Sequence, residues 1–259
     1  MDTKHKPYKI VVLSDLKEAT DSTLNSAIQL ATIINGDIDL FHVKKPIEVI
    51  ESSNQLSAVR TINKDYIVTD NTIKKLIKKT DNTLKTSLQH HIAIGNIQQE
   101  ISNYITEKKP DIIVLGKRKS KLFGLIGDHI TDFILNTYKG VVMIASDKNT
   151  FEPNHEVSLG VLKNDHLSTT MNFYEDLLKN TKKTVTTFSG GRMPKNNDLN
   201  TKSTKNRTSF LGENTDILNN VAKSDVNLFC IDRSDNNYSL KELNGFIKKL
   251  SCTVILSGS

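Results

Sequence analysis

Four basic residues stand between an apolar run and a helical pattern near the middle of the chain. The run from Asp111 to Leu115 ends in Gly116, and the cations that follow are Lys117, Arg118, Lys119 and Lys121. Gly127 and Asp128 then open the helical pattern. A strand, a glycine-containing loop and a helix start form the geometry in which backbone N–H groups meet a phosphate. The segment predicts a site for a phosphorylated ligand, and its other interpretation is a solvated basic loop.

The length and charge of the chain limit the classes of protein to consider. The chain has 259 residues and a formal net charge of +6, with 35 basic and 29 acidic residues scattered in both signs. The length suits two domains, and the mixed charge does not indicate nucleic-acid binding. No run approaches the ~18 apolar residues of a membrane span, and residues 1–7 lack the apolar core of a secretory signal. We therefore expect a cytoplasmic protein, in which Cys230 and Cys252 are reduced core residues.

Strand-like runs alternate with helical patterns through residues 1–146. The spacing predicts strands at 9–14, 39–43, 89–94, 111–115 and 141–145. It predicts helices from 20 to the glycine at 36, over 66–88, from 97 to the proline at 110, and over 128–138. Residues 47–63 are irregular and suggest a loop with a short helix at most. Because parallel neighbours need crossover connections, this alternation predicts an α/β domain with a parallel sheet covered by helices.

The same alternation begins again after a polar linker at 147–155. Strands are expected at 157–162, 184–188, 209–211, 226–231 and 252–256, with helices at 170–178, 216–222 and 240–250. Residues 190–208 are polar and read as a mobile loop that could recruit a partner. The pattern predicts a second domain over 156–259, which is a divergent and shortened repeat of the first.

Several short segments carry a resemblance to a known family. They are Ser14-Asp15, Phe41 to Val43, Gly95-Asn96, Val114 to Gly116, Gly127-Asp128 and Val141 to Ile144. In order and spacing these segments resemble a universal stress protein domain, and the whole chain resembles the tandem form of that family. The resemblance implies two parallel sheets of strand order 3-2-1-4-5, paired through their fifth strands as a pseudo-dimer within the chain. The chain itself could be a monomer or a homodimer.

The nucleotide-binding branch of that family carries Gly, two residues, Gly, nine residues, Gly and then Ser or Thr. Here Gly116 matches the first glycine, but Lys119 stands at the second, seven residues precede Gly127, and Asp128 replaces the hydroxyl residue. A lysine obstructs the close backbone approach that glycine allows, and a carboxylate at a helix N-terminus repels phosphate. Lys117 and Arg118, with Lys119, could supply charge where glycine amides are lost.

If ATP or AMP binds, the resemblance assigns roles to four residues. Asp15 would face the ribose and base, Val43 would pack near the adenine, and Gly116 and Gly127 would flank the phosphates. The simpler alternatives are a loop cap for Asp15, core packing for Val43 and ordinary turn glycines. The loop at 232–238 of the second half has no glycine and two carboxylates, so we expect no phosphate there.

Two functional interpretations remain open. The first is a stress-response regulatory or interaction protein with an unknown protein partner and no catalytic turnover. The alternative is an adenine-nucleotide-binding stress protein that uses only its first domain, with slow ATP hydrolysis as a further option. Adjacent His90 and His91 would point to opposite faces of a strand, so the sequence predicts no shared metal ion at this pair.

Overall fold

The computed structural model describes residues 6–17, 19–45, 55–80, 87–117, 128–148, 151, 153, 155–162, 172–179, 185–188, 215–233 and 239–257. The strands are β1 (Tyr8–Ser14), β2 (Gly36–Lys44), β3 (Leu88–Ile94), β4 (Ile112–Gly116), β5 (Val141–Ala145), β6 (Leu159–Leu162), β7 (Thr186–Phe188), β8 (Leu228–Ile231) and β9 (Thr253–Leu256). The helices are α1 (Thr20–Ile34), α2 (Gln55–Thr80), α3 (Ile97–Lys108), α4 (Asp128–Thr137), α5 (Asn172–Lys179), α6 (Thr215–Lys223) and α7 (Leu240–Lys249). Within these residues, no helix is both long and apolar enough to cross a membrane.

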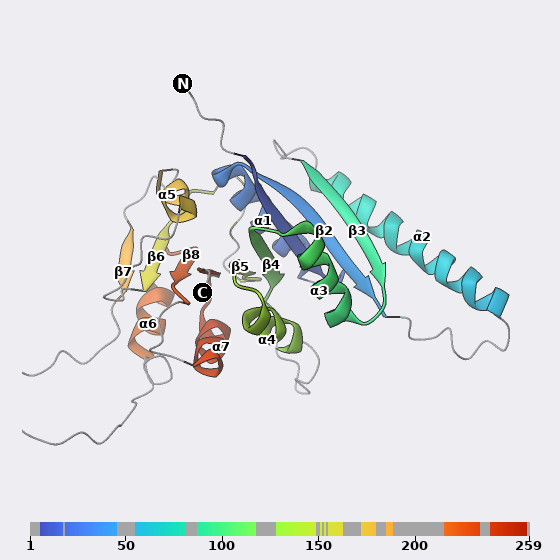
Figure 1. Ribbon diagram of the computed structural model, residues 1–259. Helices are drawn as coiled ribbons and strands as arrows, with labels where there is room; N and C mark the ends of the chain where they lie inside the picture. The colour runs from blue at the N-terminus through green and yellow to red at the C-terminus, as the bar shows by residue number, and fades with distance from the viewer. Residues whose placement is uncertain are drawn as a thin grey trace, which may run out of the picture.

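These strands lie in one sheet of order β3-β2-β1-β4-β5-β9-β8-β6-β7 (Figure 1). The first five strands are parallel and follow the order 3-2-1-4-5, as the resemblance implied. In the second half, β7, β6, β8 and β9 lie side by side in that order. They correspond to the second, first, fourth and fifth strands of the first half. Residues 209–211, where a strand was expected, and the polar segment 190–208 lie outside the described residues.

An antiparallel pair joins the two halves of the sheet. Met143 of β5 lies opposite Ile255 of β9, with Val142 opposite Leu256 and Ile144 opposite Val254. Each of these strands would otherwise be an edge with unpaired N–H and C=O groups. The two expected parallel sheets are therefore continuous with each other, and β5–β9 is the one antiparallel pair among the described strands.

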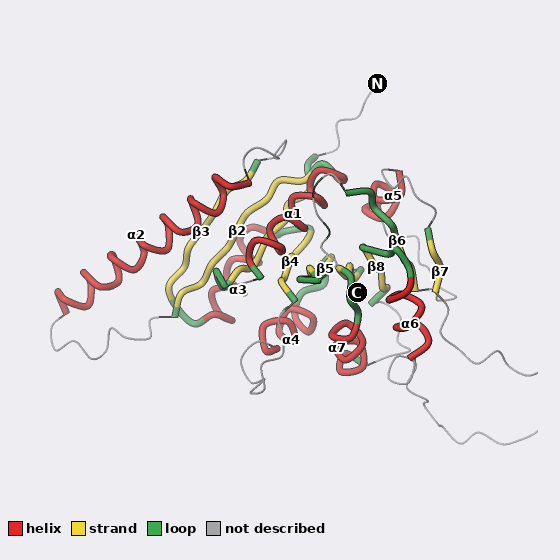
Figure 2. The backbone as a smooth tube through the Cα atoms, turned by 180° about the vertical axis from the view of Figure 1, so that it is seen from behind, coloured by secondary structure: helices red, strands yellow, loops and turns green. Residues whose placement is uncertain are grey.

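Buried side chains of the strands alternate between the two faces of the sheet. Each face has its own helical layer (Figures 1 and 2). Helices α1, α2 and α5 cover one face, whose core includes Val12, Leu40 and Val114. Helices α3, α4, α6 and α7 cover the other face, where Ile113 and Phe229 are fully buried. Both cores contain residues of both halves, so the halves are packed together as well as paired through their strands.

The end of α1 differs from the prediction. The sequence pattern placed the terminating glycine at 36, but Asn35 is the C-cap, with φ 57° and its N–H bonded to the Ala31 carbonyl. Asparagine tolerates the left-handed conformation because its short polar side chain bonds locally. Gly36 instead begins β2, where a Cβ would stand 2.7 Å from Ile10 Cδ1. The prediction for this helix end was wrong by one residue.

Helix α2 begins earlier and ends earlier than the sequence pattern indicated. It runs from Gln55 through part of the segment read as irregular, and it ends at Thr80, while Leu88 belongs to β3. Val59, Ile67 and Val68 are more than half exposed on this helix, whereas Ile73 is fully buried. Exposed apolar side chains weaken the contrast between the two sides of a helix, which explains the missed boundary.

Candidate functional site

The sheet brings three of the predicted site residues to one edge. Asp15 follows β1, Val43 lies near the end of β2, and Gly116 ends β4. Ser14 pairs with His42 and Leu13 with Leu115, so the three strands end at the same level. The carboxyl edge of a parallel sheet, next to a strand order reversal, is where α/β proteins usually bind ligands. Asp15, Val43 and Gly116 therefore lie near one another at the carboxyl edge of three adjacent strands.

The turn between β1 and α1 is held by side chains of its own. Leu16 adopts a left-handed φ of 57°, and its N–H donates to Ser14 Oγ over 3.1 Å. The N–H of Lys17 donates to Asp15 Oδ1 over 3.1 Å. Ser14 Oγ also lies 3.1 Å from Thr20 Oγ1 at the start of α1. The bond from Lys17 shows that the Asp15 carboxylate caps the loop, which was the simpler interpretation. A carboxylate has further acceptor sites and can also accept hydrogen bonds from a hydroxyl-bearing ligand.

Gly116 is a position of close packing between β4 and α1. A Cβ at this residue would stand 2.4 Å from Thr23 Oγ1. That hydroxyl is fixed in place, because it donates to the Ala19 carbonyl oxygen over 2.6 Å. The absence of a side chain at 116 therefore lets the first turn of α1 approach the end of the strand.

Lys117 points across the molecule to the second half. Its Nζ donates to the carbonyl oxygen of Ile247 over 2.9 Å and to that of Leu250, at the C-terminus of α7. These carbonyls have no partner within a helix, and a cation there also meets the negative end of the helix dipole. Burial lowers the pKa of Lys117 below its ordinary value. The first cation of the predicted phosphate loop is thus bonded to the junction between the halves.

The remaining predicted site residues are only partly described. Helix α4 begins at Asp128, as the sequence predicted. Arg118, Lys119, Gly127 and the side chain of Asp128 lie outside the described residues. The corresponding loop of the second half is described up to Arg233, a buried residue whose guanidinium donates to backbone carbonyls of the first half.

His42 is a residue of this edge to which the sequence reasoning gave no role. It is buried at the end of β2, and its Nδ1 lies 2.8 Å from the Ser14 carbonyl oxygen. A carbonyl only accepts, so Nδ1 carries the proton. Burial lowers the pKa of His42 below its ordinary value of 6.5. The signal in the sequence was a histidine directly after Leu40 and Phe41 and one residue before Val43.

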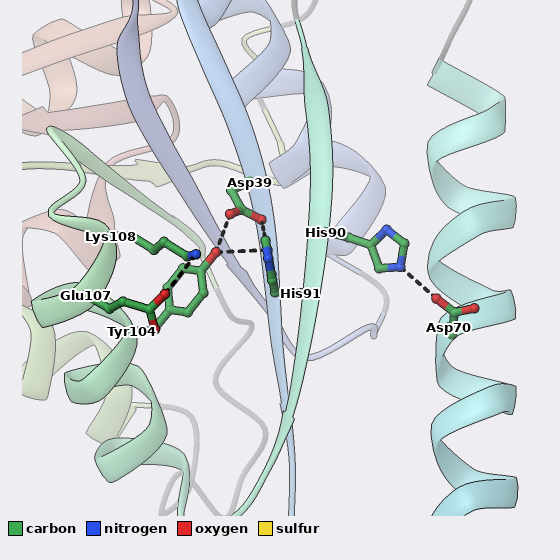
Figure 3. Close-up of polar contacts among 7 residues, drawn as sticks. All are labelled: Asp39, Asp70, His90, His91, Tyr104, Glu107 and Lys108. Atoms are coloured by element: carbon green, nitrogen blue, oxygen red, sulfur yellow. Dashed lines mark hydrogen bonds and ion pairs between the residues drawn. The ribbon is translucent and has the colours of Figure 1, made fainter.

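His90 and His91 point to opposite faces of β3, as predicted (Figure 3). His90 Nε2 lies 2.7 Å from Asp70 Oδ1 on α2, while His91 Nδ1 lies 2.8 Å from Asp39 Oδ1 on β2. The Tyr104 hydroxyl of α3 donates to the other oxygen of Asp39 (Figure 3), and burial, followed by this bond, raises the pKa of Tyr104. These contacts tie both helical layers to the edge strand. Among the described residues, no cluster of three metal-ligating side chains occurs.

The comparisons with known proteins define a family for this fold and edge. The model of the universal stress protein family matches residues 8–145, which is more than half of the chain. The chain therefore belongs to the universal stress protein family. A search of curated proteins gave no significant match.

Two solved structures match nearly the whole chain. A universal stress protein from Archaeoglobus fulgidus DSM 4304 is 11% identical, with a TM-score of 0.57, and 97% of each chain is covered. A functionally unknown protein from Pseudomonas aeruginosa PAO1 is 10% identical, also with a TM-score of 0.57, covering 97% of this chain and 92% of that one. These likenesses extend the family fold to the second half.

A third solved structure matches one half only. It is a universal stress protein in complex with cAMP, 13% identical, with a TM-score of 0.40, covering 54% of this chain and 96% of that one.

Proposed function

We propose that this universal stress protein is a regulatory or interaction protein of the stress response that works without catalytic turnover. The observation that carries the proposal is the place of Lys117, whose ammonium is bonded to α7 carbonyls instead of lying open at the ligand edge. Because Lys117 joins the two halves of the chain, its loop suits a structural and signalling role better than the binding of a reacting phosphate.

The polar groups around Asp15 also support a role without turnover. Ser14 and Asp15 brace the β1–α1 turn, and Thr23 is bonded to the backbone of α1. Because these hydroxyl and carboxylate groups already bond the backbone of the turn and of the first turn of α1, they suit a structural role at this edge.

The second candidate function is the binding of an adenine nucleotide, ATP or AMP, by the first half. It is favoured by the convergence of Asp15, Val43 and Gly116 at the carboxyl edge of three adjacent strands. An apolar Val43 side chain suits a base, and the Asp15 carboxylate suits the hydroxyls of a ribose. The cAMP bound by one relative is consistent with this candidate.

Calorimetry with ATP and AMP at millimolar concentration separates the two candidates. A regulatory protein without a nucleotide site gives no binding heat and no rise in the midpoint of thermal unfolding. A nucleotide site gives both, and Asp15→Ala then weakens the binding about tenfold, because a hydrogen bond to a charged group is lost. Asp37→Ala is the matched control, since Asp37 is exposed near the amino end of β2. Equal losses for the two variants would remove Asp15 from the site.

Lys119→Ala tests the basic loop directly. If the loop binds phosphate, this variant also weakens nucleotide binding about tenfold, through loss of a charged contact. An unchanged affinity would leave Asp15 and Val43 as a site for the nucleoside alone. Mass spectrometry of the purified protein shows whether a nucleotide is retained from the cell.

The organisation of the chain is part of the same proposal. We place the first domain at 1–146 and the second at 156–259, in a cytoplasmic protein whose domains pair within the chain as a pseudo-dimer. The antiparallel contact between β5 and β9 supports this association of the two domains. Within the linker at 147–155, Phe151 is 1% exposed, so this residue is anchored in the core. Light scattering coupled to gel filtration distinguishes a monomer from a homodimer of such chains.

A further inference from the structure

The junction between the halves has the internal symmetry of an isologous interface. The β5–β9 pairing is centred on Met143 and Ile255, so a local twofold relation makes these two residues equivalent. By the same relation Val142 is equivalent to Val254. Val142 pairs with Ile113 of β4, and Val254 pairs with Phe229 of β8. Equivalent positions can therefore be assigned from the strand register alone.

Ile113 and Phe229 are equivalent because they pair with the equivalent residues Val142 and Val254. Lys117 lies four residues after Ile113, and Arg233 lies four residues after Phe229, so Lys117 and Arg233 are equivalent too. Lys117 bonds the carbonyls of Ile247 and Leu250. Arg233 bonds the carbonyls of Leu135 and Tyr138, at 3.5 and 3.2 Å.

These four carbonyls are equivalent in the same way. Leu135 and Ile247 lie eight residues before Met143 and Ile255, and Tyr138 and Leu250 lie five residues before them. Each half thus donates one cation to the same C-terminal carbonyls of the helix in the other half. The surface is built for pairing with a copy of its own fold.

The position between α4 and α7 breaks this symmetry. Asp132 and Asn244 each lie eleven residues before the central pair, so they too are equivalent positions. They meet each other across the junction, where Asn244 Nδ2 donates to Asp132 Oδ1. Helices α4 and α7 lie side by side in both views (Figures 1 and 2). A carboxylate on one half therefore faces an amide donor on the other.

We propose that Asp132 and Asn244 make the junction surface of the first half selective for the second half of the chain and unfavourable to a second copy of the first half. Two first halves paired in this way bring Asp132 against Asp132, where two like charges meet in a partly buried place and neither carboxylate can donate a hydrogen bond. The unlike pair replaces this repulsion with a charge-assisted hydrogen bond.

Asn244→Asp tests the selection inside the intact chain, because it reproduces the carboxylate-on-carboxylate contact with almost no change of side-chain volume. The measurement is hydrogen exchange of the β5 and β9 amides relative to those of β2 and β3. We expect hydrogen exchange of the β5 and β9 amides to accelerate about tenfold at pH 7, because a charge-assisted hydrogen bond is lost.

The exchanged pair Asp132→Asn/Asn244→Asp restores the bond with its direction reversed. It should return the exchange of β5 and β9 to within about threefold of the unmutated protein. Asn220→Asp is the matched control, an exposed asparagine of α6 that receives the same charge. The proposal is overturned if the exchanged pair is no better than Asn244→Asp, if it fails to fold, or if the control accelerates β5 and β9 equally.

Discussion

Replacement of Lys117 by methionine removes one charge from the junction and keeps the length of the side chain. The ammonium donates to the carbonyl oxygens of Ile247 and Leu250, the second of which follows the last residue of α7. Lys117→Met leaves both carbonyls without this donor. We expect the C-terminus of α7 to lose this attachment to the first half, while the Asn244–Asp132 bond and the apolar packing of the stem are retained.

The size of the effect follows from two opposing contributions. A hydrogen bond from a charged donor stabilises by about 1.5–3 kcal/mol, and a cation at a partly buried helix C-terminus by up to ~2 kcal/mol. Burial of the ammonium offsets part of this, as the lowered pKa of Lys117 indicates. We expect a net loss of about 2 kcal/mol, and since ~1 kcal/mol moves the unfolding midpoint by about 2–4 °C at this size, a fall of about 4–8 °C.

Urea denaturation followed by far-ultraviolet circular dichroism measures this loss, with the thermal midpoint as a second reading. Lys249→Met is the control, because Lys249 is exposed in the last turn of the same helix, and it should change stability by less than ~0.5 kcal/mol. Lys117→Arg keeps the charge and should retain most of the stability. Equal midpoints for the two methionine variants, with unchanged urea dependence, would refute the role of Lys117 at the junction.

Three other perturbations probe the ligand edge and the contact between β1 and α5. Gly116→Ala should destabilise the protein by about 1–3 kcal/mol through overpacking against Thr23, whose Oγ1 would lie 2.4 Å from the new Cβ. Thr23→Ala in the same chain should recover part of that loss in urea denaturation, and no recovery would contradict the contact. Because His42 has a lowered pKa when folded, the unfolded chain takes up its proton first as the pH falls below 6.5, so stability falls there. His42→Gln should therefore flatten the dependence of the urea midpoint between pH 7.5 and 5, and parallel curves would count against this. Burial, followed by the hydrogen bond to Asp176, raises the pKa of Tyr8 to about 12, so its contribution is full below the ordinary value of 10.0 and is lost as the pH rises toward 12. Tyr8→Phe should remove that alkaline loss, and a decline between pH 10 and 12 as steep as in the unmutated protein would exclude Tyr8 as its source.

The alternation of apolar runs predicted the strands of the first half because burial on both faces leaves a strong signal. The run from Lys9 to Ser14 lies within β1, and the run from Val141 to Ala145 coincides with β5. Helix ends were harder to predict. At the end of α1, Asn35 adopts the left-handed conformation that the sequence pattern assigned to the neighbouring Gly36. In α2, exposed apolar residues weaken the helical pattern, so its ends could not be predicted.

The partners of the site residues were beyond the reach of local patterns. The strand ends carrying Asp15, Val43 and Gly116 meet because the predicted strand order places them together. Lys117, by contrast, was assigned to a phosphate loop from its neighbours in sequence, whereas its ammonium bonds carbonyls 130 and 133 residues away. Such a contact depends on how the two halves pack.

For Cys230 and Cys252, the sequence pattern predicted burial but not the face of the sheet on which each thiol lies. Both are buried and free, as the sequence predicted. They lie on opposite faces of the sheet, because Cys230 belongs to one core and Cys252 to the other. A disulfide bridge between Cys230 and Cys252 would need one side chain to cross the sheet.

The antiparallel pair β5–β9 also affects the chain during its synthesis. Strand β5 ends at Ala145, and its partner begins at Thr253, more than a hundred residues later. At a translation rate of 5–20 residues per second, the outer edge of β5 waits roughly 5–20 s for its partner on the ribosome. Nascent chains that lie close together on one messenger RNA present that edge to each other during this interval. The time before β9 emerges is therefore the period in which selectivity against a second first half matters most to the chain.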